Sequence, residues 1–328
     1  MRKPRCIAFL LVAILCLASL PGRAEDKKDD VDDIGNRKVA HRSIISQEKE
    51  IAIGKQYADQ IDKEAKILKD PVINEYVNRL AQNLARNSDL TIPLTIKVID
   101  DPAINAFTLP GGFMYINTGT LLAADEEDQV AGVIAHEIGH AAARHWASTQ
   151  TKATILQYAM IPMIFIPMSY PVYMGVMEAY MNGVPLAFLK FSRKDEQEAD
   201  FLGLQYMYKA GYDPNAFVGF FGKVMDEERR SPGSMAKVFA DHPPTGDRII
   251  AAEEEIQTIL PKRPEYLVST SEFDDMKARL ETIITQHKRQ KSDTGPSLRK
   301  REAPNTTQSG KQKTDSGDDQ PPVLKRRD

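Results

Sequence analysis

Apolar and polar positions recur with a helical period over most of the central part of the chain. Helices are predicted over 46–69, 70–86, 125–145, 193–209, 214–229, 245–259 and 272–288. Short apolar segments bounded by turn residues at 94–99, 103–107 and 113–116 predict the strands of a small sheet. We therefore expect an α+β fold that is mainly α-helical.

The first 24 residues have a different pattern. Basic residues are followed by an apolar run over 6–20 and by the small residues Gly22 and Ala24. This order is typical of a secretory signal peptide, here with cleavage after Ala24. A retained signal anchor, or a lipid anchor at Cys16, is the alternative. The expected location is the periplasm.

The charge is unevenly distributed along the chain. The net charge of −3 combines +4 over residues 1–24, −12 over residues 25–287 and +5 over residues 288–328, where there are 11 Lys and Arg and 6 Asp and Glu. We expect a flexible segment at 25–42, one domain at 43–287 and a disordered tail at 288–328. The tail either solubilises the protein or tethers it to an anionic lipid, a cell-wall polymer or a partner. The acidic domain argues against nucleic acid as a ligand.

The candidate catalytic motif is His136-Glu137-Ile138-Gly139-His140. Residues four apart lie on one face of a helix, so the imidazoles of His136 and His140 can bind one zinc ion. Glu137 would then lie beside a water molecule that the metal activates, as general base and later as general acid. The motif predicts zinc-dependent peptide hydrolysis.

Two histidines leave a catalytic zinc ion one protein ligand short. Both cysteines, Cys6 and Cys16, lie in the leader, so the third ligand must be a histidine or a carboxylate. The acidic stretch that follows Ser192 contains Glu196 and Asp200, which share a helix face. One can bind metal while the other orients a histidine ligand, and spacing alone leaves Glu198 as a competitor.

Together these motifs resemble the M48 family of zinc metallopeptidases, which includes soluble periplasmic members. The resemblance covers residues 43–259 and rests on six segments: HEIGH at 136–140, SRKDEQEAD at 192–200, KAGYDP at 209–214, DHPPTGDR at 241–248, NAF at 105–107 and PGG at 110–112. It implies a zincin-like fold with an active-site helix. It also implies one zinc ion bound by His136, His140 and Glu196, with Asp200 in a supporting role.

The same resemblance implies a role for His242 that could not be predicted from the residues around it. A histidine before two prolines is ordinarily a turn residue. In the family this histidine approaches the zinc, either as a partner of the transition-state oxyanion or as a displaceable resting ligand. Arg248 is expected to tie this segment to acidic groups, whereas His145 is expected to be structural and His41 to have no cluster around it.

Two further segments have predicted roles in binding. The strand that begins at Phe113 is interpreted as an edge strand that pairs with an extended substrate, the alternative being an ordinary core strand. Residues 153–189 contain Glu178 as their only charge and are rich in methionine. We interpret them as a lid over the cleft, with peripheral membrane contact or a membrane-inserted hairpin as alternatives.

The sequence therefore predicts a periplasmic zinc metalloendopeptidase. Its expected partners are unfolded or misassembled envelope polypeptides, since backbone pairing gives little sequence selectivity. A chaperone-like assembly factor with gated or secondary proteolysis is the alternative, and a purely structural zinc protein is a third hypothesis.

Overall fold

The computed structural model describes residues 30–160, 174, 191–230, 242 and 245–293. The predicted signal peptide at 1–24, most of the 153–189 insert and most of the tail at 288–328 lie outside these residues. The chain divides into two units, Met1–Ile284 and Thr285–Asp328, and the following description concerns the first. Among the described helices, none is long and apolar enough to cross a membrane.

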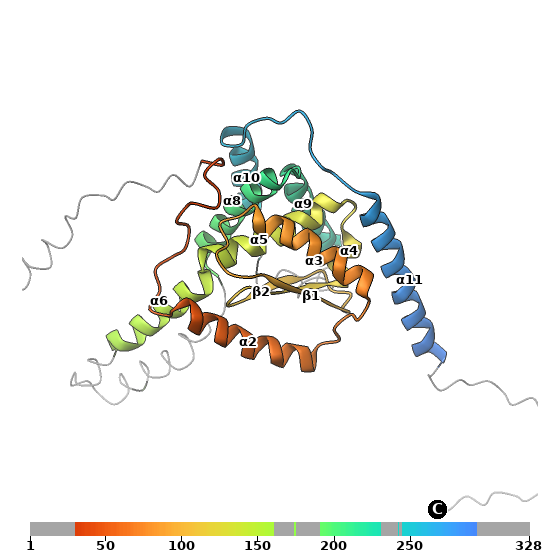
Figure 1. The fold of residues 1–328 in the computed structure, drawn as a ribbon, viewed down its shortest axis with the longest axis horizontal. Coiled ribbons are helices and arrows are strands. Elements are labelled where there is room, and N and C mark those ends of the chain that lie inside the picture. Colours follow the sequence, from red (N-terminus) through yellow and green to blue (C-terminus); the bar gives the residue numbers. More distant parts are fainter. Residues whose placement is uncertain (1–29, 161–173, 175–190, 231–241, 243–244, 294–328) are drawn as a thin grey trace, which may run out of the picture. The chain divides into compact units, whose positions relative to one another are not determined.

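A three-stranded sheet lies at the centre of this unit (Figure 1). Its strands are β1 (Thr95–Ile99), β2 (Ala106–Leu109) and β3 (Phe113–Asn117). Their order in the sheet is β1-β3-β2, with β1 parallel and β2 antiparallel to β3. All three strands overlap the segments predicted from the sequence. A short helix, α4 (Thr118–Ala123), follows β3 directly and was not predicted.

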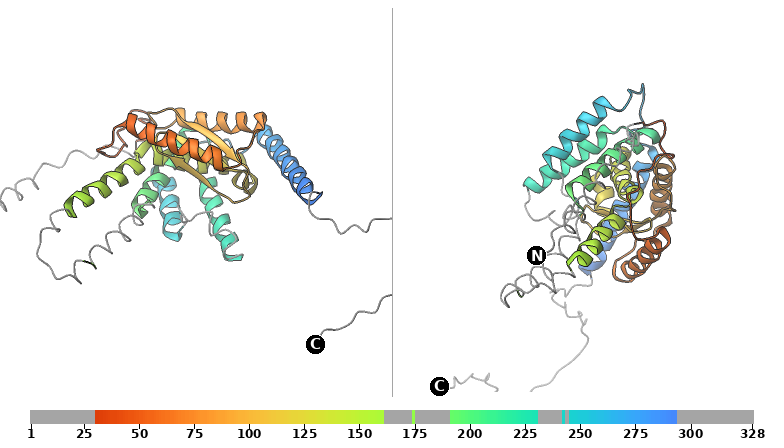
Figure 2. Two further views of the ribbon diagram at one scale, coloured as in Figure 1. Left: turned by 90° about the horizontal axis from the view of Figure 1, so that it is seen from below. Right: turned by 90° about the vertical axis from the view of Figure 1, so that its left-hand side faces the viewer.

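Helices cover both faces of the sheet. On one face, α2 (Gln47–Glu64) lies across the strands, as the view from below shows (Figure 2), and Tyr115 of β3 packs against its Ala58. On the other face, Met114 and Ile116 join the main core with α3 (Pro71–Arg86) and α5 (Glu127–Ala143). The side chains of β3 thus alternate between two apolar layers, as expected for a strand buried on both faces.

The helix that carries HEIGH packs very closely against α8 (Arg193–Ala210). A Cβ atom added at Gly139 of α5 would lie 2.8 Å from the carbonyl oxygen of Ala199, and one added at Gly203 of α8 would lie 3.0 Å from the backbone nitrogen of His136. Only glycine allows this approach. A capping box of Ser192 and Asp195 begins α8, on the N-terminal side of this contact.

The predicted helix over 125–145 is interrupted at Arg144. This residue has φ 55°, in the left-handed region, and separates α5 from α6 (His145–Met160). Its guanidinium donates hydrogen bonds of 2.8 Å to Glu50 and to the carbonyl of Ile45. These contacts with the start of α2 stabilise a backbone conformation that a non-glycine residue rarely adopts.

The segment 25–42 was expected to be flexible, and the structure differs from this expectation for residues 30–42. Val31 and Val39 are buried, and Arg37 forms an ion pair of 2.6 Å with Asp89, both side chains being almost fully buried. The backbone nitrogen of His41 donates to the carbonyl oxygen of Ala143, at the end of α5. The apolar positions of this segment follow no single period, so this packing could not be predicted from the local pattern.

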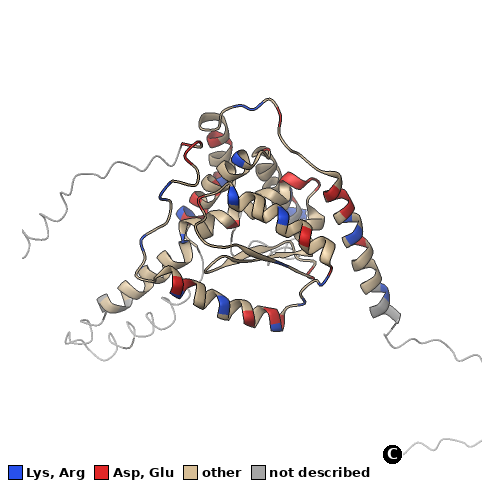
Figure 3. Cartoon of the chain, in the orientation of Figure 1, with Lys and Arg blue, Asp and Glu red and all other residues tan. Residues whose placement is uncertain are grey.

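The C-terminal helices are α9 (Asn215–Arg230), α10 (Gly246–Thr258) and α11 (Ser271–Asp293). α9 and α10 lie within one residue of the predicted bounds. α11 runs past Ile284, where the first unit ends, and stays helical to Asp293, five residues beyond its predicted end and into the segment expected to be disordered. α9 and α10 pack against each other and against the site helices (Figure 2). Acidic and basic residues are interspersed along α2, α3 and α11 (Figure 3).

Candidate metal centre

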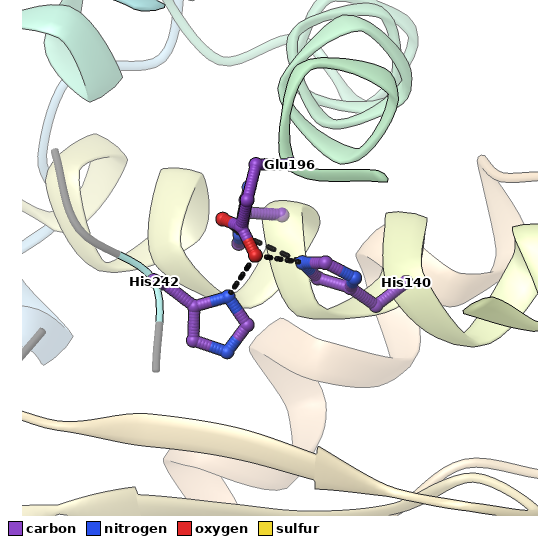
Figure 4. Close-up of side chains that lie close together, drawn as sticks. His140, Glu196 and His242 are labelled. Atoms are coloured by element: carbon purple, nitrogen blue, oxygen red, sulfur yellow. Dashed lines mark hydrogen bonds and ion pairs between the residues drawn. The ribbon is translucent and has the colours of Figure 1, made fainter. Parts of the chain in front are cut away.

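Two elements bring His136, His140 and Glu196 together. The histidines lie one turn apart on α5, and Glu196 reaches them from the first turn of α8 (Figure 4). The Nε2 atoms of the two histidines are 3.1 Å apart, and Glu196 oxygens lie 3.6 Å from each of them. All three side chains are buried. The close contact between α5 and α8 thus sets the distance between the histidines and the carboxylate.

This donor set fits a metal ion. Two imidazole nitrogens that point at each other across 3.1 Å need a proton or a cation between their lone pairs. A separation of 3.6 Å from the carboxylate oxygens is too long for a hydrogen bond. It is close to the spacing of about 3.3 Å between ligand atoms around a tetrahedral zinc ion. His242 is a fourth donor, and the ligand atoms of all four residues lie within 4.8 Å of one another.

Asp200 and Arg248 lie behind this donor set. Asp200 Oδ1 is 2.9 Å from His136 Nδ1, within ion-pair distance, so this carboxylate lies behind the ring while Nε2 faces the metal position. Arg248 donates two hydrogen bonds of 2.6 Å to Asp200 and lies 3.0 Å from Glu196 Oε2. The expected tie between the segment of Arg248 and acidic groups is present.

His242 and Glu137 face each other across the site. His242 Nδ1 is 2.9 Å from Glu196 Oε1 (Figure 4). The Nε2 atom of His242 is 3.8 Å from Glu137 Oε1. Both residues line a pocket together with Asn105 and Ala106 at the start of β2 and with Phe217 of α9. The chain therefore has an apolar-walled pocket whose polar groups converge on the metal position.

Burial and charge perturb several pKa values in the site. Burial raises the pKa of Glu137, which favours holding a proton. Burial lowers the pKa of His136, but the neighbouring carboxylates of Asp200 and Glu196 outweigh this effect and raise the pKa to about 9. Burial and the neighbouring histidines lower the pKa of His140 well below its usual range, which favours a neutral imidazole able to bind a cation.

The interpretation of the strand at Phe113 as an edge strand is wrong. β3 pairs with β1 on one side and with β2 on the other, so its backbone groups are used within the sheet. In the sheet formed by the described residues, the edge strand next to the site is β2, which packs against α5 and begins at Ala106 in the pocket wall. Strand order depends on pairing between distant segments, which the alternation of side chains does not specify.

A second cluster next to the metal centre was missed. His41, His145 and Glu198 lie together, with His41 Nε2 2.6 Å and His145 Nε2 3.2 Å from Glu198 Oε2. The expectation that His41 has no cluster around it is therefore wrong. Nothing local in the sequence indicated the contact, because His41 and Glu198 are 157 positions apart.

The geometry of the site agrees with the comparison with known families. The model of peptidase family M48 matches residues 71–256, more than half of the chain, and the chain belongs to this family. M48 metallopeptidases depend on a metal ion, and the cluster of His136, His140, Glu196 and His242 could hold one.

Curated relatives include bacterial and mitochondrial proteases. The chain is 28% identical to the beta-barrel assembly-enhancing protease of Escherichia coli over 84% of this chain and 56% of that protein. It is 30% identical to the protein of the same name from Yersinia pestis, over 68% of this chain and 48% of that protein. The mitochondrial metalloendopeptidase OMA1 of Arabidopsis thaliana is 37% identical over 49% of this chain and 32% of its own length. The chain thus spans about half the length of its first bacterial relatives.

Proposed function

We propose that this protein is a zinc-dependent endopeptidase that cleaves misfolded or misassembled envelope proteins. The observation that carries the proposal is the convergence of His136, His140 and Glu196 on one point with Glu137 beside it in a buried pocket. A structural zinc site would not need a pocket or a carboxylate next to the metal that is not itself among the donors.

His136, His140 and Glu196 would hold the ion. When bound, zinc would polarise the scissile carbonyl and lower the pKa of a nearby water molecule. Glu137 accepts a proton from the attacking water and donates it to the amine nitrogen as the carbon–nitrogen bond breaks. The raised pKa of Glu137 supports both steps, because the carboxyl must keep the proton until the amine leaves.

His242 is proposed as a displaceable ligand of the resting site. Its Nδ1 lies among the other three donors, 2.9 Å from Glu196, which supports this role over that of an oxyanion partner. Asp200 is proposed to orient His136 and, through Arg248, to hold the segment of His242 in place; the carbonyl of His242 accepts a hydrogen bond of 3.4 Å from Arg248.

An extended polypeptide is proposed to bind along β2. This strand is at an edge of the described sheet and borders the pocket at Asn105 and Ala106, so a substrate strand added there would pass Glu137. The proposed location in the bacterial envelope is supported by the leader pattern and by relatives named for beta-barrel assembly. Membrane contact through residues 153–189 stays a hypothesis.

The decisive experiment measures metal content and casein cleavage for the purified full chain. We expect about one zinc ion per chain, cleavage by the loaded protein and its loss with a chelator. A zinc-loaded protein without measurable cleavage would contradict the proposal. If such a protein still suppressed aggregation of unfolded clients, the chaperone-like alternative would replace it.

A further inference from the structure

The two histidines of the HEIGH motif are supported in different ways. His136 Nδ1 faces the carboxylate of Asp200 directly, at 2.9 Å. His140 Nδ1 instead faces another imidazole, that of His145, with the two Nδ1 atoms 2.9 Å apart. His145 Nε2 in turn faces Glu198, at 3.2 Å. The second histidine therefore reaches a carboxylate only through an intermediate ring.

The break at Arg144 makes this contact. On a continuous helix, a residue five positions after His140 would point away from it, because each residue turns by about 100°. Arg144 has a left-handed backbone, and His145 begins a new helix. The rings of His140 and His145 lie 4.9 Å apart between centroids, and His145 is fully buried.

The side chains of His140, His145 and Glu198 form a hydrogen-bonded series. Only one placement of the protons in this series leaves His140 Nε2 free to bind a metal ion. A ligand nitrogen must be unprotonated, so a neutral His140 with Nε2 at the metal carries its proton on Nδ1. That proton is donated to His145 Nδ1, and His145 then carries its own proton on Nε2. The acceptor for this second proton is Glu198 Oε2, which when ionised can only accept.

The N-terminal segment contributes a further residue, His41, to this series of side chains. His41 Nε2 lies 2.6 Å from the same oxygen of Glu198 and supplies a second donor. His41 is fixed by its backbone bond to Ala143, and the neighbouring Ser43 hydroxyl lies 2.8 Å from that of Thr151 on α6. Docking of residues 37–43 thus holds Glu198 towards His145.

We propose that His145 and Glu198, assisted by His41, form a hydrogen-bonded relay that fixes the tautomer of His140 and so sets the affinity of the metal centre. All are positioning residues. The proposal rests on the proposed metallopeptidase function and assigns Glu198, a competitor for the ligand role by spacing, to the support of His140. One helix, α8, then supplies the metal ligand Glu196 and a support for each histidine.

The same proton order argues against a second metal ion at His41, His145 and Glu198, although their donor atoms lie within 4.8 Å of one another. A metal on His145 Nε2 would require a proton on His145 Nδ1. His140 Nδ1 would then have to accept, and its proton would move to Nε2, the atom needed at the catalytic centre. Two metal ions would compete through one shared proton.

The test is zinc affinity of the full chain, measured by competition with a chromophoric chelator. In His145→Phe, which fills the space without an acceptor, and in Glu198→Leu, we expect the zinc dissociation constant to rise about 10- to 100-fold. His145→Asn, whose amide oxygen can accept from His140, should recover most of the affinity. Glu253→Leu, which removes an exposed carboxylate from α10, is the control for net charge and should stay within about twofold of the unaltered protein.

A spectroscopic measurement separates this role from general packing. In long-range proton–nitrogen spectra of the zinc-loaded, ¹⁵N-histidine protein, His140 should show a protonated Nδ1, and this signal should weaken in His145→Phe. Unchanged zinc affinity in both His145→Phe and Glu198→Leu would overturn the relay. Two zinc ions in the unaltered chain and one in Glu198→Leu would overturn it in favour of a second metal site. An unaltered chain that binds no zinc would overturn the metallopeptidase function itself.

Discussion

Arg248 and Asp200 form a buried bidentate ion pair, with two hydrogen bonds of 2.6 Å from the guanidinium to the carboxylate. The pair joins α10 to α8, and its carboxylate also contacts His136. A lysine carries the charge but lacks the planar fork. In this arrangement the shape of the cation matters as well as its charge.

We therefore expect Arg248→Lys to lower zinc affinity by about 10- to 100-fold, as loss of outer support to a metal ligand typically does. Arg248→Met should also lower the free energy of unfolding by about 3–5 kcal/mol, because Asp200 keeps a buried charge without its partner. Chelator competition and thermal unfolding measure the two effects. Arg79→Lys, at an exposed ion pair on α3, is the control, and an equal effect there would contradict the expectation.

Glu137→Gln separates metal binding from chemistry. The amide keeps the size of the side chain but cannot act as a general base, so the cleavage rate should fall by about 10²- to 10⁴-fold. Zinc content should be unchanged, since Glu137 is not one of the converging donors. The matched variant is Glu126→Gln, an exposed carboxylate at the start of the same helix, which should cleave normally.

His242→Ala distinguishes the two roles considered for this residue. As a displaceable ligand, His242 competes with substrate for the metal, so its removal should raise the casein cleavage rate of the zinc-loaded protein. Three donors remain, and zinc should still bind. A reduced rate at full zinc loading would instead assign His242 to the oxyanion.

Gly139→Ala tests the contact that sets the geometry of the site. The added methyl group would lie 2.8 Å from the Ala199 carbonyl oxygen, so α5 and α8 must separate. We expect a loss of about 1–3 kcal/mol of folding stability, as for other overpacked cores, together with weaker zinc binding. Gly222→Ala on α9 has open space around the new methyl group and should stabilise the helix by up to about 1 kcal/mol. Similar melting temperatures for both variants would contradict this account.

Asp128 makes stability depend on pH. Burial and the charge of Glu126 raise the pKa of Asp128 to about 7 in the folded protein, above its ordinary value of 3.8. The folded state therefore binds the proton more tightly than the unfolded state, and stability is lost as pH rises through this window. Asp128→Asn should raise the melting temperature more at pH 8 than at pH 5. An equal gain at both pH values would show that this carboxyl group does not titrate as described.

Local periodicity predicted those parts of the site that lie within one helix. The four-residue spacing of His136 and His140, and that of Glu196 and Asp200, places each pair on one face, and the structure has both arrangements. Helix bounds at Pro71 and Arg193 follow from capping residues in the same local way. Physical rules that act over a few residues were sufficient for these features.

The features that could not be predicted from the sequence depend on contacts between residues far apart along the chain. The central place of β3 requires pairing with both β1 and β2. The left-handed turn at Arg144 is held by Glu50, 94 positions earlier, and no glycine indicates it. His41 reaches Glu198 only because residues 30–42 pack on the core. Such contacts become visible only once the whole domain is assembled.

The dependence of the site on α10 also has a consequence for the order of biosynthesis. His136 and His140 are synthesised long before Arg248, and Asp200 has no guanidinium partner at this position until α10 has folded back onto α8. A chain that is still being synthesised, or that is cut before α10, contains the complete HEIGH motif but lacks Arg248, which holds Asp200 behind His136. The outer support of the metal centre therefore depends on a segment that is synthesised after all three of its proposed ligands.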